Sequence, residues 1–256
     1  MTVPGTFDTS ARELIHAGLQ NLDEARSLFR QLSASGFDAA RCGLLLDALQ
    51  HVCDPDVALR NLVDIVNAQV SQGRALDDIM PDDTAFRQLV AVLGVSDAMG
   101  KLMRFRPDLV QAAATDHCNS HLYNHDQRRA HVLESVGADP NDRMSPTATM
   151  DLADAATALR RTYRNQLAAI IAQDTMSDDP IALQPRISSE LSDLADAALE
   201  GALAIARHEI TGSEHCRFAI IGMGKLGARE LNYVSDVDLI YVVKAADADT
   251  SQQQLY

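Results

Sequence analysis

The stretch from Phe218 to Val243 constrains the fold more than any other, because it places a glycine-rich turn between two short apolar runs. Gly222, Gly224 and Gly227 have the spacing G-x-G-x-x-G and come directly after the run RFAIIG, while the run VDLIYVV follows the turn. Both runs are rich in β-branched residues, which is typical of strands. We therefore expect a strand, a turn, a helix over KLGARELN and a second strand. Since a two-stranded sheet is not stable alone, we expect more chain or another chain to complete it.

The preceding part of the chain has a different pattern. From residue 9 to about residue 210, apolar residues recur at helical spacing and are interrupted by proline and glycine. The stretch TSARELIHAGLQNLDEARSLFRQL, residues 9–32, predicts one helix with a Ser or Thr cap. Two longer helices are predicted over residues 147–174 and 186–210. This pattern predicts a mainly α fold, a helical array, with a terminal α+β unit.

The composition excludes two classes of partner. The chain has 36 Asp and Glu residues against 22 Lys and Arg residues, and a surface this negative repels a nucleic-acid backbone. No apolar run approaches the length that spans a membrane, so we expect neither a nucleic-acid partner nor a membrane. The four cysteines are scattered without paired short spacing, which is typical of free thiols in a reducing compartment. We therefore expect a soluble, cytoplasmic protein.

The glycine spacing by itself suggests a dinucleotide-binding turn. Such a site needs an acidic residue roughly 20 positions further on, near the end of the second strand, to bind the ribose. Here Asp236 and Asp238 lie 14 and 16 residues past Gly222, and they precede the second apolar run. A dinucleotide-binding domain also needs further strand–helix units, which the sequence does not supply. The order of the parts therefore disfavours this interpretation.

A nucleotidyl-transfer site fits the same order better. Residues two apart on a strand face the same side, so Asp236 and Asp238 are expected to project together, with Val237 pointing into the core. Two carboxylates on one face suit Mg²⁺, which bridges the phosphates of a nucleotide. The N–H groups of the glycine turn can approach a phosphate closely, and Lys225 can add a contact. The pattern predicts half of a phosphoryl-transfer site.

The segment GMGKLGARELNYVSDVDLI resembles the signature of the glutamine synthetase adenylyltransferase/adenylyl-removing enzyme family, G-K-L-G-x-x-E-L-N-x-x-S-D-x-D-L-I. Every fixed position is present: Gly224, Lys225, Leu226, Gly227, Glu230, Leu231, Asn232, Ser235, Asp236, Asp238, Leu239 and Ile240. Upstream helical stretches resemble those that precede the first catalytic domain in actinobacterial-type members. Together the similar stretches cover most of residues 82–243.

The resemblance implies a polymerase-β-like nucleotidyltransferase fold. Residues 1–180 would be the helical N-terminal region, and residues 186–256 the start of the deadenylylating domain, cut partway. In that domain of the family, phosphate attacks the adenylyl-tyrosine bond on glutamine synthetase and releases ADP. The forward reaction from ATP belongs to a second domain of the family's longer chain. The implied partners are glutamine synthetase and a nitrogen-regulatory signalling protein, and the implied process is the regulation of nitrogen assimilation.

The resemblance also implies roles for single residues. Asp236 and Asp238 would be the catalytic residues and the Mg²⁺ ligands. The residues that would bind the nucleotide phosphates are Gly222, Gly224, Lys225 and Ser235. The residues that would shape the loop are Gly227, Glu230 and Asn232. The family's third carboxylate comes from a later strand, so we expect little or no turnover from the chain up to Tyr256 alone. The alternative is a non-catalytic helical module that binds glutamine synthetase or a regulatory protein.

One further cluster stands apart from this motif. His117, His121 and His125 are four residues apart, so a helix would align them on one face, with Cys118 beside it. Such a set of side chains could hold zinc. The asparagine, serine and aspartate residues among them favour a solvated connector instead.

Overall fold

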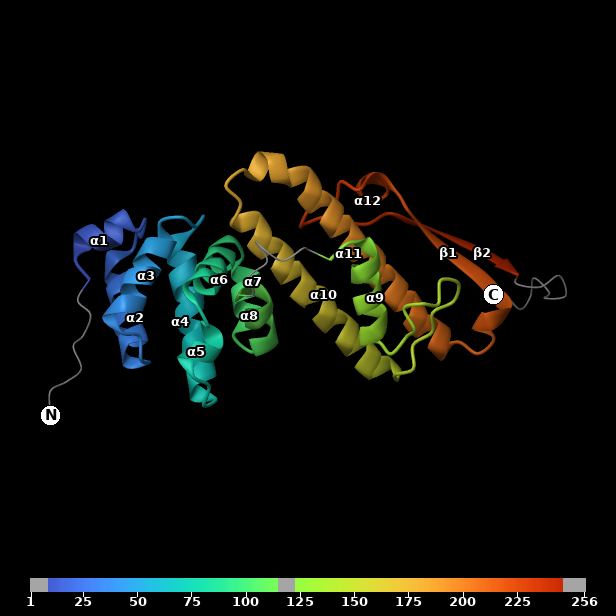
Figure 1. The fold of residues 1–256 in the computed structure, drawn as a ribbon, viewed down its shortest axis with the longest axis horizontal. Coiled ribbons are helices and arrows are strands. Elements are labelled where there is room, and N and C mark those ends of the chain that lie inside the picture. Colours follow the sequence, from blue (N-terminus) through green and yellow to red (C-terminus); the bar gives the residue numbers. More distant parts are fainter. Residues whose placement is uncertain (1–8, 115–122, 246–256) are drawn as a thin grey trace. The chain divides into compact units, whose positions relative to one another are not determined.

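The computed structural model describes residues 9–114 and 123–245 (Figure 1). These residues form two compact units, of which the first contains residues 9–114 and 171–180 and the second contains residues 123–170 and 181–245. Both units are mainly helical, and a small two-stranded sheet lies near the end of the second. The predicted fold class, a helical array followed by a partial α+β unit, is confirmed.

The first unit is an array of helices packed around α6. Its helices are α1 (Ala11–His16), α2 (Leu22–Ala34), α3 (Ala39–Leu49), α4 (Pro55–Ser71), α5 (Leu76–Ile79), α6 (Asp83–Val95), α7 (Asp97–Met103) and α8 (Pro107–Ala114). The central helix α6 packs against α3, α4, α7 and α8. It buries Phe86, Leu89 and Leu93 almost completely. These residues are three or four positions apart, so the helical spacing in the sequence places them on one face.

The stretch predicted as one helix over residues 9–32 forms two helices, α1 and α2. Gly18 lies between them with a φ of 82°, a left-handed conformation that ends α1. Asn21 then caps α2, because its side chain accepts a hydrogen bond from the N–H of Glu24 (3.3 Å). The prediction of a single helix is wrong, since this glycine and this asparagine act as helix-end signals.

The second unit contains the sheet and most of the two longest helices among the described residues. Its elements are α9 (His125–Ser135), α10 (Leu152–Thr175), α11 (Pro180–Glu209), the 3-10 turn η1 (Ser213–His215), β1 (Cys216–Gly222), α12 (Gly224–Ala228) and β2 (Leu239–Ala245). Helix α11 begins at Pro180, ahead of the predicted start at Arg186. Proline is favourable in the first turn of a helix, where its missing N–H has no partner to lose. The predicted domain division between residues 180 and 186 stays a prediction.

The two predicted strands are both present, and they pair with each other. Strand β1 runs antiparallel to β2, in a register that pairs Cys216 with Ala245 at one end and Gly222 with Leu239 at the other. Alternate residues of β1 are half-buried, as the period of two along a strand predicts. Across the described residues, no helix is both long enough and apolar enough to cross a membrane.

A hydrophobic cluster attaches the turn region to the long helices. Leu226 of α12 and Leu231 after it are buried against Ile170, Leu191 and Leu194 of α10 and α11. Burial of leucine side chains of this size stabilises a contact by about 1.5–3 kcal/mol each. The apolar residues inside the glycine-rich motif therefore fix the position of the turn on α11.

Candidate functional site

The glycine turn links the end of β1 to α12 without room for side chains. A Cβ on Gly227 would lie 2.5 Å from the carbonyl oxygen of Gly222, and a Cβ on Gly222 would lie 2.8 Å from Cγ of Leu226. Gly224 has a φ of 54°, in the left-handed region that favours glycine. Each glycine of the G-x-G-x-x-G spacing is therefore required by a close approach or by the backbone conformation.

Helix α12 is shorter than the predicted helix over KLGARELN. It ends at Ala228, because Arg229 adopts the left-handed conformation (φ 60°) and the N–H of Glu230 returns to the carbonyl of Lys225 (2.8 Å). The Arg229 guanidinium donates to Ser189 Oγ (2.7 Å) and lies 2.7 Å from Asp193 Oδ1 on α11. These contacts with α11 hold the reversed chain in place after the turn.

A short loop joins α12 to the acidic residues. The Asn232 side chain is hydrogen-bonded to Ser235 Oγ. In the amide orientation that satisfies both groups, the Asn232 oxygen accepts a hydrogen bond from Lys225 Nζ (3.3 Å). The Asn232 nitrogen then donates to the carbonyl of Val234 (2.9 Å). Asn232 thus lies between the lysine of the glycine turn and the serine that precedes the two aspartates. Leu231 adds a further anchor, since its N–H donates to Ser192 Oγ of α11 (3.3 Å).

Asp236 and Asp238 lie in the loop before β2, not on the strand. The strand begins at Leu239, which pairs with Gly222, the last residue of β1. Residues before Leu239 have no β1 residue opposite them, because the chain has already turned into α12. Val237 is 39% exposed, so the prediction that it points into the core is wrong.

Asp238 nevertheless lies directly beside the glycine turn. The N–H of Met223 donates to the carbonyl of Asp238 (2.8 Å), and Asp238 Oδ2 lies 3.7 Å from the place of a Cβ on Gly224. Both carboxylates are exposed. Within the described part of the chain, neither Asp236 nor Asp238 has a side-chain hydrogen bond or an ion pair. Two uncommitted carboxylates next to the glycine turn fit a hard divalent cation.

The family follows from comparison with known proteins. Residues 86–255 match the sequence profile of the family described as Glutamate-ammonia ligase adenylyltransferase. The chain belongs to this family. It is 67% identical, over 97% of its length, to a protein of Bifidobacterium longum (strain DJO10A) named bifunctional glutamine synthetase adenylyltransferase/adenylyl-removing enzyme. Proteins of the same name from Cutibacterium acnes and Leifsonia xyli are 32% and 36% identical over 93% and 91% of the chain.

This member of the glutamate-ammonia ligase adenylyltransferase family spans only part of its relatives. It covers 23% of the length of the Bifidobacterium and Leifsonia proteins and 24% of the Cutibacterium protein. The resemblance that the motif suggested is confirmed at the level of the family.

The structure adds residues to the adenylyltransferase-family motif that the sequence pattern did not single out. Arg229 occupies a variable position of the motif, and Ser189, Ser192 and Asp193 lie on α11, outside it. In the sequence these residues are only polar, but the structure buries two of them: Ser192 is 0% exposed and Asp193 is 7% exposed. Buried polar groups need partners, so these positions indicate a specific contact.

A cavity of about 590 Å³ lies between α11 and β1 within the second unit. Arg143, Arg207 and Arg229 line it together with Asp196 and the glycine turn. Burial raises the pKa of Asp196 above its usual value, and nearby positive charge only partly offsets this effect. The cavity is therefore polar and holds charges of both signs.

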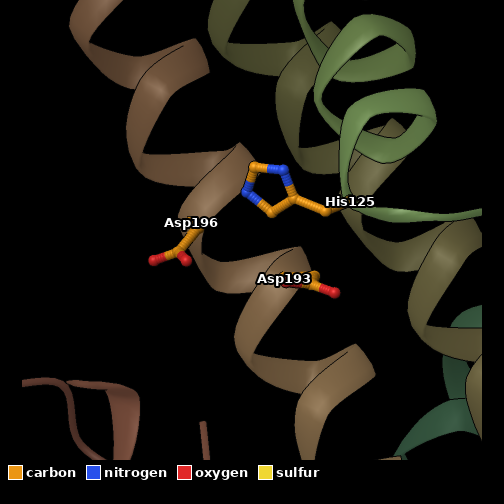
Figure 2. Close-up of side chains that lie close together, drawn as sticks. All are labelled: His125, Asp193 and Asp196. Atoms are coloured by element: carbon orange, nitrogen blue, oxygen red, sulfur yellow. The ribbon is translucent and has the colours of Figure 1, made fainter. Parts of the chain in front are cut away.

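The predicted histidine cluster is only partly described. His117, Cys118 and His121 lie outside the described residues. His125 is the first residue of α9 and comes close to Asp193 and Asp196 of α11 (Figure 2). The histidine thus meets acidic partners from another helix, which the four-residue spacing did not indicate.

Proposed function

We propose that the glycine turn, Lys225 and the two aspartates form part of a Mg²⁺-dependent nucleotidyl-transfer site. Its reaction is the removal of the adenylyl group from a tyrosine of glutamine synthetase by phosphate. The observation that carries the proposal is the position of Asp238, whose free carboxylate lies beside Gly224 while its carbonyl holds the N–H of Met223. Membership of the adenylyltransferase family and the names of its relatives support the substrate.

The residues of the site divide the work in this proposal. The first N–H groups of α12 have no carbonyl partner inside the helix, so they are available to a phosphate oxygen. Lys225 supplies a positive charge next to them, and Asn232 accepts a hydrogen bond from its ammonium group. A helix of five residues has only a small dipole, so we assign the phosphate contacts to these N–H groups and to Lys225.

Asp236 and Asp238 complete the site as ligands of the cation. When bound, Mg²⁺ would neutralise the negative charge on the phosphate oxygens of the reacting groups. A phosphate oxygen forms the new bond to the adenylyl phosphorus, and the bond from that phosphorus to the tyrosine oxygen breaks. ADP leaves, and the tyrosine oxygen regains a proton. In this scheme the chain binds and orients the phosphates.

Nucleotide binding to the 256-residue chain tests the proposal. We expect ADP to bind with a dependence on Mg²⁺, measured by isothermal titration calorimetry with and without EDTA. Asp236→Asn and Asp238→Asn remove ligand charge and are expected to weaken binding at least about tenfold, since loss of a charge-assisted contact costs about 1.5–3 kcal/mol. Asp154→Asn is the matched control, because its carboxylate is exposed on α10.

ADP binding that persists in EDTA, or that Asp236→Asn and Asp238→Asn leave unchanged, would contradict the proposed site. If glutamine synthetase bound the chain equally well with and without these substitutions, while ADP did not bind at all, a helical binding module would describe the chain better.

A further inference from the structure

Three possible metal ligands from two helices meet in the second unit. His125 is the first residue of α9, and Asp193 and Asp196 are three positions apart on α11. One ligand atom from each residue lies within 4.8 Å of the others (Figure 2). Side chains three apart on a helix share a face, and His125 of α9 comes close to that face of α11.

The buried Asp193 carboxylate is only partly satisfied by its neighbours. It is 7% exposed, and its buried Oδ1 accepts no hydrogen bond from the described residues. Arg229 Nη2 forms an ion pair with this oxygen at 2.7 Å, and it also donates a hydrogen bond to Ser189 Oγ. The ion pair with Arg229 offsets part of the cost of burying this carboxylate, and a coordinated cation would offset more of it. The cluster also has two carboxylates against the single charge of Arg229.

The cluster is open to solvent on one side. His125 and Asp196 line the cavity between α11 and β1, so an ion can reach the ligand atoms through it. Arg143 also lines this cavity, but Asp126 accepts a hydrogen bond from it (3.0 Å), which partly neutralises its charge.

We propose that His125, Asp193 and Asp196 bind a divalent transition-metal ion of the zinc class. Imidazole nitrogen together with carboxylate oxygen suits Zn²⁺ and its neighbours, whereas Mg²⁺ takes oxygen ligands. In a tetrahedral zinc site, ligand atoms about 2.1 Å from the ion lie roughly 3.4 Å from one another. Small side-chain rotations would bring the three ligand atoms from their present separations to this distance. The ion joins the start of α9 to α11 and leaves one coordination position to solvent. This site is separate from the oxygen-only pair Asp236 and Asp238.

Metal binding to the 256-residue chain tests this proposal. We expect one Zn²⁺ per chain by equilibrium dialysis and elemental analysis, and a higher melting temperature in the presence of Zn²⁺. His125→Ala and Asp196→Asn are expected to lower the affinity at least about tenfold and to abolish the shift in melting temperature. His131→Ala is the matched control, because His131 is an exposed histidine of the same helix and lies outside the cluster.

Two further measurements separate this site from other ligands in the chain. The double variant Asp236→Asn/Asp238→Asn is expected to keep its Zn²⁺, because the proposed nucleotide site uses different residues. Co²⁺ in place of Zn²⁺ is expected to give visible bands without thiolate-to-cobalt charge transfer, since no cysteine is a ligand. Undiminished binding in His125→Ala, a thiolate charge-transfer band, loss of the ion in the double variant, or no saturable binding would each overturn the proposal. Circular dichroism of each variant checks that the helices are intact.

Discussion

Replacement of Arg128 by methionine is expected to lower the free energy of unfolding of the second unit by about 3 kcal/mol. The Arg128 side chain is 1% exposed, donates to Gln166 Oε1 (2.8 Å) and is paired with Glu190. Without the guanidinium, Glu190 is left as a nearly buried charge, which is why the expected loss is large. Arg186, 3.7 Å from the other oxygen of Glu190, partly compensates, so the loss falls at the lower end of the range for buried pairs.

Urea unfolding followed by tyrosine fluorescence measures this loss in the correct unit. The chain has no tryptophan, and its tyrosines within the described residues all lie in the second unit. The signal therefore reports this unit rather than the helical array. The double variant Arg128→Met/Glu190→Leu is expected to recover part of the stability, because it removes the unpaired charge as well.

A surface ion pair of the same unit provides the control. Arg143 pairs with Asp126 in an exposed position, and such pairs contribute little to stability. Arg143→Met is expected to leave the urea midpoint nearly unchanged. If Arg128→Met cost no more than Arg143→Met, the buried pair between α9 and α11 would not stabilise the unit.

Gly227→Ala is expected to disrupt the glycine turn. The new Cβ would lie 2.5 Å from the carbonyl oxygen of Gly222, so backbone has to move and not only a flexible side chain. We expect a loss of about 1–3 kcal/mol in the stability of the second unit, the usual cost of forcing extra atoms into a packed region. We also expect Mg²⁺-dependent ADP binding to weaken at least about tenfold, because the N–H groups of α12 shift with the backbone.

The same substitution at an open position is its control. A Cβ on Gly43 of α3 would have no atom within 4 Å. Gly43→Ala is expected to leave ADP binding unchanged and to stabilise the first unit by about 0.5–1 kcal/mol, since alanine is the better helix former. Calorimetric melting and ADP titration of both variants measure the two effects. Equal ADP binding in Gly227→Ala and Gly43→Ala would show that the close approach in the turn does not matter for the nucleotide.

Short-range patterns were sufficient to predict much of this protein. The change from helical spacing to two β-branched runs correctly predicted both the helical array and the strands, because these periods are visible within a few residues. The motif likewise indicated the family, since its glycines and aspartates lie within one short segment. The single helix over residues 9–32 was predicted wrongly because periodicity outweighed the end signals at Gly18 and Asn21.

The exact placement of the site depended on contacts between distant segments. Strand β2 begins at Leu239, because this residue pairs with Gly222 at the end of β1 and no β1 residue remains to pair with earlier ones. Asp236 and Asp238 therefore precede the strand. Arg229 anchors the loop on Ser189, which is 40 residues earlier in the chain. Such contacts leave no periodic signal along the sequence, because each partner alone is only a polar residue.

The sequence alone therefore determines which residues form the site and in what order, because the glycine turn and the acidic pair lie within one short segment. The meeting of His125 with Asp193 and Asp196, and the burial of Arg128 against Glu190, are properties of the tertiary structure. Both arise only when α9 packs on α11, which brings together residues more than 60 positions apart and excludes water from the Arg128–Glu190 pair.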